Sequence, residues 1–476
     1  MEPWLYHADT FDFGDLELRP CRASPRLRQP PRAPSGRSRP RCRPLLFGES
    51  MTMSSIRGWF MWIARWLQHV FVHRRNTLLV VSQYAFAKYL RTNPRLGRIL
   101  ARLSALFRGT HRHTVAFVCF HTVPAWWDGY LPAGTAGSEE AVVHMSRQLA
   151  RLGWPVVVYN HCGRKRTVNG VTYIPLWRYN LHEYHAVIVL WRDYSLLSFP
   201  IASGKIYVWL HDAVNDAGFA SLIVDGSATV IVLSAFHRNS IAAVPDEHVF
   251  ISRNGVDIPS WIDSTHARQP RKILYTSSPD RGLEILLALW PRIRASVPDA
   301  ELFIYYGWRT WDFFHASDPT KVAWKERILA SMEQPGVMTR FPHLDAAELW
   351  REYANSGFWI YPAMVGETSC ISAIKAQAAG AVPICTSLGA LAETVQWGAR
   401  IDGHGLSDDS KVQESFVRIA VEALSSNHTV DRQAMTDWAR ARYGWASVAA
   451  DWNAHMRDAL AAAGNPSPKI ISGPTG

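Results

Sequence analysis

The chain has 476 residues, 48% of them apolar. A chain of this length is too long for one compact core, so we expect two domains with extensions. Its net charge of +11 is uneven, because residues 1–127 carry 20 Lys and Arg against 6 Asp and Glu, whereas the other 349 residues carry 31 against 34. A basic excess restricted to one terminal arm argues against a nucleic-acid groove through the folded body and favours docking to an anionic surface such as phospholipid.

The cysteines include no CxxC pair and no metal-ligand spacing, so we expect free thiols in a reducing compartment and no structural zinc. They are Cys21, Cys42, Cys119, Cys162, Cys370 and Cys385.

Residues 19–44 hold nine Arg and seven Pro. A segment of this composition cannot bury enough apolar surface to fold, so we expect residues 1–50 to be a disordered extension. Met51 and Met53 follow directly, and a reading frame that starts at one of them is the alternative explanation of this tract.

Residues 51–112 form a basic, aromatic-rich segment, in which Asp and Glu are absent. We expect a helical extension, either lying in the interface of an anionic membrane or packed against the folded body. No apolar run reaches the roughly 18 residues of a spanning helix. The acidic start of the chain and Arg65 argue against a signal peptide. We therefore expect a cytoplasmic protein, peripheral to the cytoplasmic membrane face if residues 51–112 bind lipid.

The chain from residue 113 onward alternates between strand and helix patterns. Apolar runs typical of buried strands occur at 114–120, 155–160, 186–191, 205–210 and 229–233. Between the first two, SEEAVVHMSRQLARLG (138–153) has helical spacing and a terminal glycine. Strand, helix and strand in this order predict a parallel sheet, so we expect residues 113–255 to be one doubly wound domain.

A turn-rich segment at 251–261, ISRNGVDIPSW, precedes a second series of strand patterns. These lie at 272–277, 301–307, 357–362 and 382–387. The expected parts are a second Rossmann-like domain at 256–435, a helix at 436–460 that packs back on the first domain, and a flexible tail at 461–476. The predicted fold class is thus α/β, with two doubly wound domains facing a central cleft, and ligands of such sheets bind at the carboxyl ends of strands.

The strand pattern GFWIYP is followed by VGETSC and a helix pattern that ends at Gly380. Thr368 or Ser369 can cap this helix, and its first unpaired N–H groups, at Cys370 and the two residues after it, can bind an anion such as phosphate. Glu367, after Gly366, is placed to accept hydrogen bonds from the hydroxyls of a neutral polyol beside that anion. The alternative is an ordinary capped helix.

Five segments taken together resemble glycosyltransferase family 4, the retaining enzymes of the GT-B fold. The resemblance keeps the family's order from about residue 114 to residue 455. The segments are HDAVND (211–216), VLSAFHR (232–238), ISRNGVD (251–257), YTSSPDRGLEILL (275–287) and GETSCISAIKAQAAGAVPI (366–384).

The resemblance implies transfer of a sugar from a nucleotide-sugar co-substrate to a glycan, glycolipid or protein acceptor, with retained anomeric configuration and no metal or other cofactor. The family has two glutamates separated by seven residues. Glu367 matches the first, which contacts the hydroxyls of the donor sugar. Lys375 stands at the second, which receives the ribose diol. An ammonium can only donate, so we expect Lys375 to reach a phosphate or a base acceptor, to point into solvent, or to pair with an acid.

The resemblance also implies roles for residues outside that helix. Arg281 matches the basic residue aimed at the donor diphosphate, where cationic stabilisation of the leaving group helps most. The family's second basic residue falls at Thr276 and Ser277 in this chain, which leaves one cation here. His211 matches a histidine beside the donor sugar, with the leaving phosphate rather than the imidazole taking the acceptor's proton.

Two weaker matches complete the predicted site. Gly137 and Ser138 resemble the small-residue entry to the family's first helix, where backbone N–H groups approach a ligand. Glu393 resembles a donor-binding residue in the turn after the next strand, and a structural cap is its alternative.

The rival functions are a catalytically impaired GT-B protein that binds sugars or partners, a GT-B phosphorylase or epimerase, and a nucleic-acid-binding protein. The near-neutral folded body argues against nucleic acid, and no acid–base pair around a sugar ring identifies an epimerase. Lys375 and the missing second cation favour the impaired binder as the alternative to an active transferase.

Overall fold

The computed structural model describes residues 110–464, and the predictions for residues 1–50, for residues 51–109 and for the chain beyond 464 lie outside that range. Within it the description omits residues 121–124, 132–136, 182, 199–200, 215, 263–266, 306, 309–310, 313–314, 341–343 and 426–429. The described residues form two sheets that belong to one compact unit of the chain.

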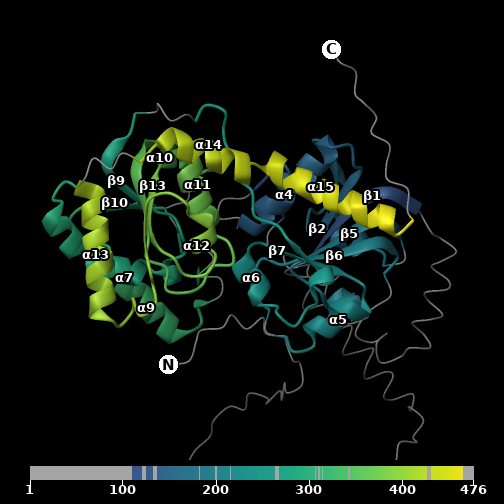
Figure 1. Ribbon diagram of the computed structural model, residues 1–476, viewed down its shortest axis with the longest axis horizontal. Coiled ribbons are helices and arrows are strands. Elements are labelled where there is room, and N and C mark those ends of the chain that lie inside the picture. The colour runs from purple at the N-terminus through teal and green to yellow at the C-terminus, as the bar shows by residue number, and fades with distance from the viewer. Residues whose placement is uncertain are drawn as a thin grey trace, which may run out of the picture. The chain divides into compact units, whose positions relative to one another are not determined.

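The first sheet has eight strands in the order β3-β4-β2-β1-β5-β6-β7-β8. Figure 1 labels β1, β2, β5, β6 and β7 of this sheet. Only the β3–β4 pair is antiparallel. The strands are β1 Thr110–Cys119, β2 Val156–Asn160, β3 Arg166–Val168, β4 Val171–Pro175, β5 Tyr184–Trp191, β6 Ser203–Trp209, β7 Thr229–Val232 and β8 Val249–Ile251. Its helices include α4 Gly137–Arg151, α5 Phe219–Asp225 and α6 Ala235–Asn239.

The second sheet is parallel throughout and has six strands in the order β11-β10-β9-β12-β13-β14. The strands are β9 Gln269–Tyr275, β10 Glu301–Ile304, β11 Val337–Thr339, β12 Ser356–Tyr361, β13 Val382–Thr386 and β14 Ala399–Ile401. Its helices include η5 Pro279–Arg281, α7 Leu283–Ser296, α9 Pro319–Ser331, α10 Ala346–Asn355, α11 Ile371–Ala379, α12 Leu391–Thr394, α13 Ser410–Ser425 and α14 Arg432–Tyr443.

Both sheets are doubly wound. In the first, β1 pairs with both β2 and β5, and in the second, β9 pairs with both β10 and β12. Strand order therefore reverses beside β1 and beside β9, which are the positions where such sheets open a crevice at the carboxyl ends of their strands. The predicted α/β class with two doubly wound domains is confirmed.

The strands form where the sequence has continuous apolar runs, because helices cover both faces of each sheet. In β5, seven of the eight residues are buried. The nine expected strands are all present, whereas β3, β4, β8, β11 and β14 were not predicted. Four of these have three residues and the fifth, β4, has five, and strands this short carry too little periodic pattern to be recognised.

The last helix, α15 Trp445–Ala462, packs against α4 and β6 of the first domain (Figure 1). Its buried side chains, among them Trp445 and Trp452, share a core with that sheet. Two connecting segments run between the domains side by side, because the N–H of Val256 donates to the carbonyl of Tyr443 at 2.8 Å. A Cβ on Gly255 would overlap the indole of Trp445, so this close approach requires glycine.

In the part of the chain that the structure describes, none of the helices combines the length and the apolar character needed to cross a bilayer.

Candidate functional site

The loops after the strands of the two sheets contact each other. Thr368, after β12, donates its hydroxyl to the carbonyl of His211, after β6, at 2.8 Å. Ser234, after β7, donates its hydroxyl to the carbonyl of Thr368, also at 2.8 Å. The carboxyl ends of both sheets therefore face one another at this point.

Glu367 lies next to this contact, and its backbone is held by the loop after β13. The N–H of Ala390 donates to the carbonyl of Glu367 at 2.8 Å. Gly389 has a φ of +62°, and a Cβ there would lie 2.6 Å from the backbone nitrogen of Glu367. Only glycine permits this close approach, and the contact fixes the backbone position of Glu367.

The side chain of Glu367 is half-buried and accepts a hydrogen bond from Tyr361, whose Oη lies 2.5 Å from Oε1. Burial raises the pKa of the Glu367 carboxyl, while the charge of Arg281 and the tyrosine hydrogen bond act to lower it. A partly desolvated carboxylate with one oxygen already bonded is suited to accept further hydrogen bonds from a ligand's hydroxyls.

Arg281 ends the short helix η5 after β9. The next residue, Gly282, has a φ of +127°, and a Cβ there would overlap the carbonyl oxygen of Pro362. This contact presses the η5 turn against the end of β12, which brings the guanidinium close enough to lower the pKa of Glu367. The Arg281 side chain is 30% exposed, with Asp280 at 3.9 Å.

His211 is half-buried, and its ring packs against the indoles of Trp209 and Trp191, with centroids 4.7 and 6.1 Å away. Burial lowers the pKa of His211 well below its ordinary value, and the charge of Arg192 lowers it further. Its Nε2 atom is buried and has no hydrogen-bond partner among the described residues. The imidazole is therefore neutral and retains one polar atom for a ligand.

The expectation that Thr368 or Ser369 caps α11 is wrong. The N-cap is Cys370, without a capping hydrogen bond from its side chain, and the hydroxyl of Thr368 goes to His211 instead. Ser369 is half-buried, and the thiol of Cys370 is buried, which raises its pKa well above the ordinary value. The helix begins opposite the start of α4, since a Cβ on Gly137 would lie 2.7 Å from the side chain of Ile371.

Lys375 forms an ion pair with Glu140 of α4, with its Nζ 3.1 and 3.3 Å from the two carboxylate oxygens. The side chains are 13% and 23% exposed. Burial alone raises the pKa of Glu140, but Lys375 and His144 outweigh burial and lower it to about 2. Of the three alternatives for Lys375, the structure shows the ion pair with an acid. That acid, Glu140, belongs to the first domain, whereas Lys375 belongs to the second.

Glu393 accepts hydrogen bonds from the backbone N–H groups of Ala235 and Phe236, each at 2.8 Å. These are the first two residues of α6, so a carboxylate of one domain satisfies the N-terminus of a helix in the other. Beside it, a Cβ on Gly366 would overlap the ring of Phe236. The structural cap, which was the alternative role for Glu393, is therefore present, and it joins the two domains.

Two further predicted residues have partners within their own domains. Ser277 donates to the hydroxyl of Tyr361 at 3.3 Å. Ser138 donates to the carboxylate of Glu139 at 2.9 Å. The structure thus brings Glu367, Arg281, Ser277, His211 and the start of α11 together. Gly137 and Ser138 lie at the start of α4, opposite the start of α11.

Sequence reasoning missed Tyr361, Ser234 and Glu140. A tyrosine in the position before the final proline of GFWIYP was the only signal for Tyr361. Nothing local marks Ser234 or Glu140, because their partners lie 134 and 235 positions away.

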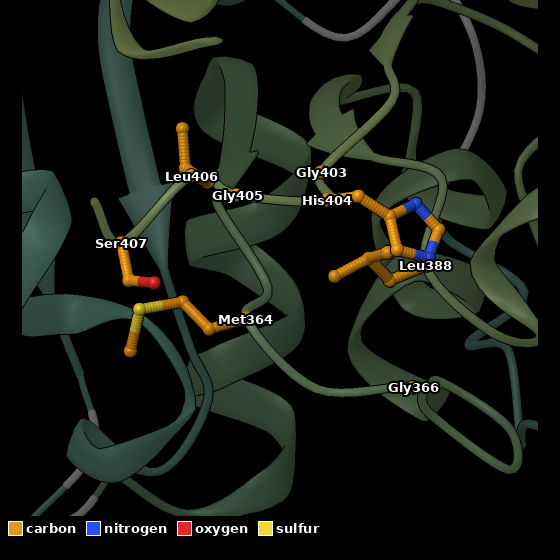
Figure 2. A pocket seen from close by; sticks show the side chains of 8 residues that line it. All are labelled: Met364, Gly366, Leu388, Gly403, His404, Gly405, Leu406 and Ser407. Carbon is orange, nitrogen blue, oxygen red and sulfur yellow. The ribbon is translucent and has the colours of Figure 1, made fainter. Parts of the chain in front are cut away.

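A surface hollow of about 270 Å³ adjoins the Glu367 loop. Figure 2 shows Met364 and Ser407 at one end of it and His404 and Leu388 at the other. Its walls come from the loops after β12, β13 and β14, at the same carboxyl edge of the second sheet. Among the described residues, no three His, Cys, Asp or Glu side chains gather as metal ligands would.

No protein-family model matches the sequence, and no curated protein matches it. Solved structures do resemble the fold. AviGT4, a glycosyltransferase involved in avilamycin A biosynthesis, is 15% identical over 73% of this chain and 98% of its own, with a TM-score of 0.52. HepE from Anabaena, solved in complex with UDP and glucose, is 12% identical over 73% of this chain and 100% of its own, with a TM-score of 0.50.

The chain has the GT-B fold. The sheet of β1–β8 forms the N-terminal GT-B domain, and the sheet of β9–β14 forms the C-terminal one. A match with the pneumococcal O-GlcNAc transferase GtfA, at 13% identity and a TM-score of 0.45, covers 58% of this chain and 57% of that one. The match with this chain thus covers little more than half of that transferase's own length.

Proposed function

We propose that this GT-B protein is a glycosyltransferase that moves a sugar from a nucleotide-sugar donor to a glycan, glycolipid or protein acceptor. The observation that carries the proposal is the placement of Glu367. Its carboxylate lies where the carboxyl ends of both sheets meet, within the field of Arg281 and next to the residue that bonds His211. Doubly wound sheets bind their ligands at this edge.

In the proposed reaction, the Glu367 carboxylate accepts hydrogen bonds from hydroxyls of the donor sugar. Arg281 and the first N–H groups of α11 balance the negative charge that develops on the departing diphosphate, which is the largest help a protein gives in such a step. His211, neutral and with Nε2 unbonded, contacts the sugar. The leaving phosphate takes the acceptor's proton, the anomeric configuration is retained, and no metal takes part.

The nucleotide contacts of this proposal differ from those of the family it resembles. Lys375, in the middle of α11, and Glu140, in the first turn of α4, present a hydrogen-bond donor and acceptors side by side. A nucleoside diol can therefore bond to either charge. HepE and GtfA were crystallised with UDP, so UDP-sugars are the first donors to test.

The experiment incubates the purified full-length protein with a panel of nucleotide sugars, beginning with UDP-glucose, and follows release of nucleoside diphosphate. We expect Glu367→Ala to lower turnover at least about 100-fold, as when one strong transition-state contact is lost. Glu326→Gln removes an exposed carboxylate of α9 and serves as the matched control, with unchanged turnover. Full activity in Glu367→Ala would remove the assigned role.

The alternative is a GT-B protein that binds sugars or partners without turnover. One observation favours it: Lys375, Glu393 and Ser277, three of the expected donor contacts, already have partners inside the protein. Absence of diphosphate release, together with absence of donor binding by calorimetry, would support this alternative.

A further inference from the structure

Three polar groups form a hydrogen-bonded series that ends at Glu367. The hydroxyl of Ser277, after β9, donates to Oη of Tyr361, at the end of β12, over 3.3 Å. Oη of Tyr361 donates in turn to Oε1 of Glu367 over 2.5 Å. In the part of the chain that the structure describes, Tyr361 is the only hydrogen-bond donor to this carboxylate.

The geometry of Tyr361 leaves its hydroxyl little freedom. The residue is fully buried, and its ring packs against Trp359 and Tyr275, with centroids 5.2 and 6.0 Å away. Closely packed interiors hold side chains in one rotamer, so the ring cannot swing away from the glutamate. Ser277 uses the lone pair of Oη and thereby directs the tyrosine's hydrogen toward Glu367.

The phenol remains a donor at all physiological pH values. Burial raises the pKa of Tyr361 well above its ordinary value, and the negative charge of Glu367 raises it further. Hydrogen bonds to a charged group are about twice as strong as neutral ones, so a permanently protonated phenol is an effective anchor for one carboxylate oxygen. The other oxygen is left for a ligand.

We propose that Tyr361 is the positioning residue of Glu367, with Ser277 orienting the tyrosine hydroxyl. Tyr361 fixes one carboxylate oxygen so that the second oxygen faces the donor sugar in the transferase function proposed above, on which this inference rests. The residue acts through Glu367 and does not itself contact the substrate.

The test compares Tyr361→Phe with the native protein in the diphosphate-release assay across pH. The ring and its packing stay, so we expect kcat to fall about 10-fold with KM for the donor within about twofold, because the carboxylate loses orientation. The removed hydrogen bond no longer stabilises the ionised form, so the acid limb of the pH profile moves to higher pH. Ser277→Ala, which only loosens the phenol, should shift the same limb less.

Tyr353→Phe is the matched control. Tyr353 is another buried tyrosine of the same domain, and its hydroxyl bonds to Thr276 at 2.5 Å rather than to Glu367. Loss of its hydroxyl should leave the acid limb where it is in the native protein. A general packing defect would instead lower activity equally at every pH in both variants.

A second measurement does not need turnover. The infrared difference between the native protein and Glu367→Gln isolates the carboxylate of Glu367, and its titration can be repeated on a Tyr361→Phe background. We expect the carboxylate to protonate at higher pH without the phenol. An unshifted titration would overturn the role of Tyr361, whereas a shift in a protein without transferase activity would sustain that role and reject the proposed function.

Discussion

The pair of Lys375 and Glu140 shows how one residue changes the chemistry of a site. Lys375 lies in the middle of α11, and this helix has no acidic side chain to balance its charge. Glu140 supplies a compensating carboxylate across the domain boundary at 3.1 Å. The charge reversal at position 375 is thus balanced by an acid that the sequence places 235 residues earlier.

The ion pair has a predictable pH dependence. The pKa of Glu140 falls from an ordinary 4.5 to about 2 on folding, so its contribution to stability is complete above 4.5 and is lost as pH falls toward 2. We expect Lys375→Met to have a lower free energy of unfolding than the native protein at pH 6, and we expect this difference to become smaller below pH 4.5. Urea unfolding at pH 6, 4.5 and 3 measures this gap.

Lys411→Met, at an exposed position in α13, is the control for that measurement and should show no pH-dependent gap. A gap for Lys375→Met that stays constant from pH 6 to pH 3 would contradict the assigned pairing.

At the scale of elements, single glycines decide how the loops after the strands approach one another. Gly282 lets η5 contact the end of β12, and Gly389 lets the loop after β13 contact the backbone of Glu367. The site residues are therefore positioned by backbone contacts between loops, and a side chain at either glycine would separate them.

Gly282→Ala tests this arrangement. The new Cβ would overlap the carbonyl of Pro362 and would also strain a backbone at φ +127°, so we expect a loss of about 2–4 kcal/mol in the free energy of unfolding. Diphosphate release should fall with it, because Arg281 moves away from Glu367. Denaturant unfolding and the donor assay measure the two effects.

Gly163→Ala separates strain from overlap. Gly163 has a φ of +74°, but a Cβ there meets nothing within 4 Å, so only the backbone strain of about 1 kcal/mol is expected. Equal losses at the two positions would mean that the Pro362 contact is unimportant.

At the scale of the whole molecule, polar contacts join the two GT-B domains at the site: Lys375 with Glu140, Thr368 with Ser234 and His211, and Glu393 with the start of α6. The two connecting segments meet at Gly255 and Trp445. Several residues that the family resemblance assigns to donor binding therefore also form the contacts between the two domains.

A charge swap tests whether the pair couples the domains. Glu140→Lys and Lys375→Glu each place like charges in contact, and we expect each to lower the melting temperature and to broaden or split the calorimetric transition. The double variant restores opposite charges and should recover most of the loss, with a coupling energy of about 1 kcal/mol or more. Additive losses in the double variant would show that the two residues do not interact.

Local pattern was enough to predict much of this protein. Both faces of a parallel sheet are buried, so its strands need continuous apolar residues. Runs such as 186–191 can therefore be recognised as strands from the sequence. The location of Glu367 and Arg281 at the carboxyl edge of the second sheet was also predictable, since each follows a strand pattern, and their roles at the site stay predictions.

The amino-acid sequence by itself determined the α/β class, the two doubly wound sheets and the edge at which the candidate site residues gather, because each depends on residues adjacent along the chain. Only the tertiary structure decided which partner each polar group takes: Glu140 for Lys375, α6 for Glu393, His211 for Thr368 and Tyr361 for Glu367. A charged or hydroxyl group bonds to whatever complementary atom comes within about 3 Å, and that distance depends on how two separate domains and their loops meet.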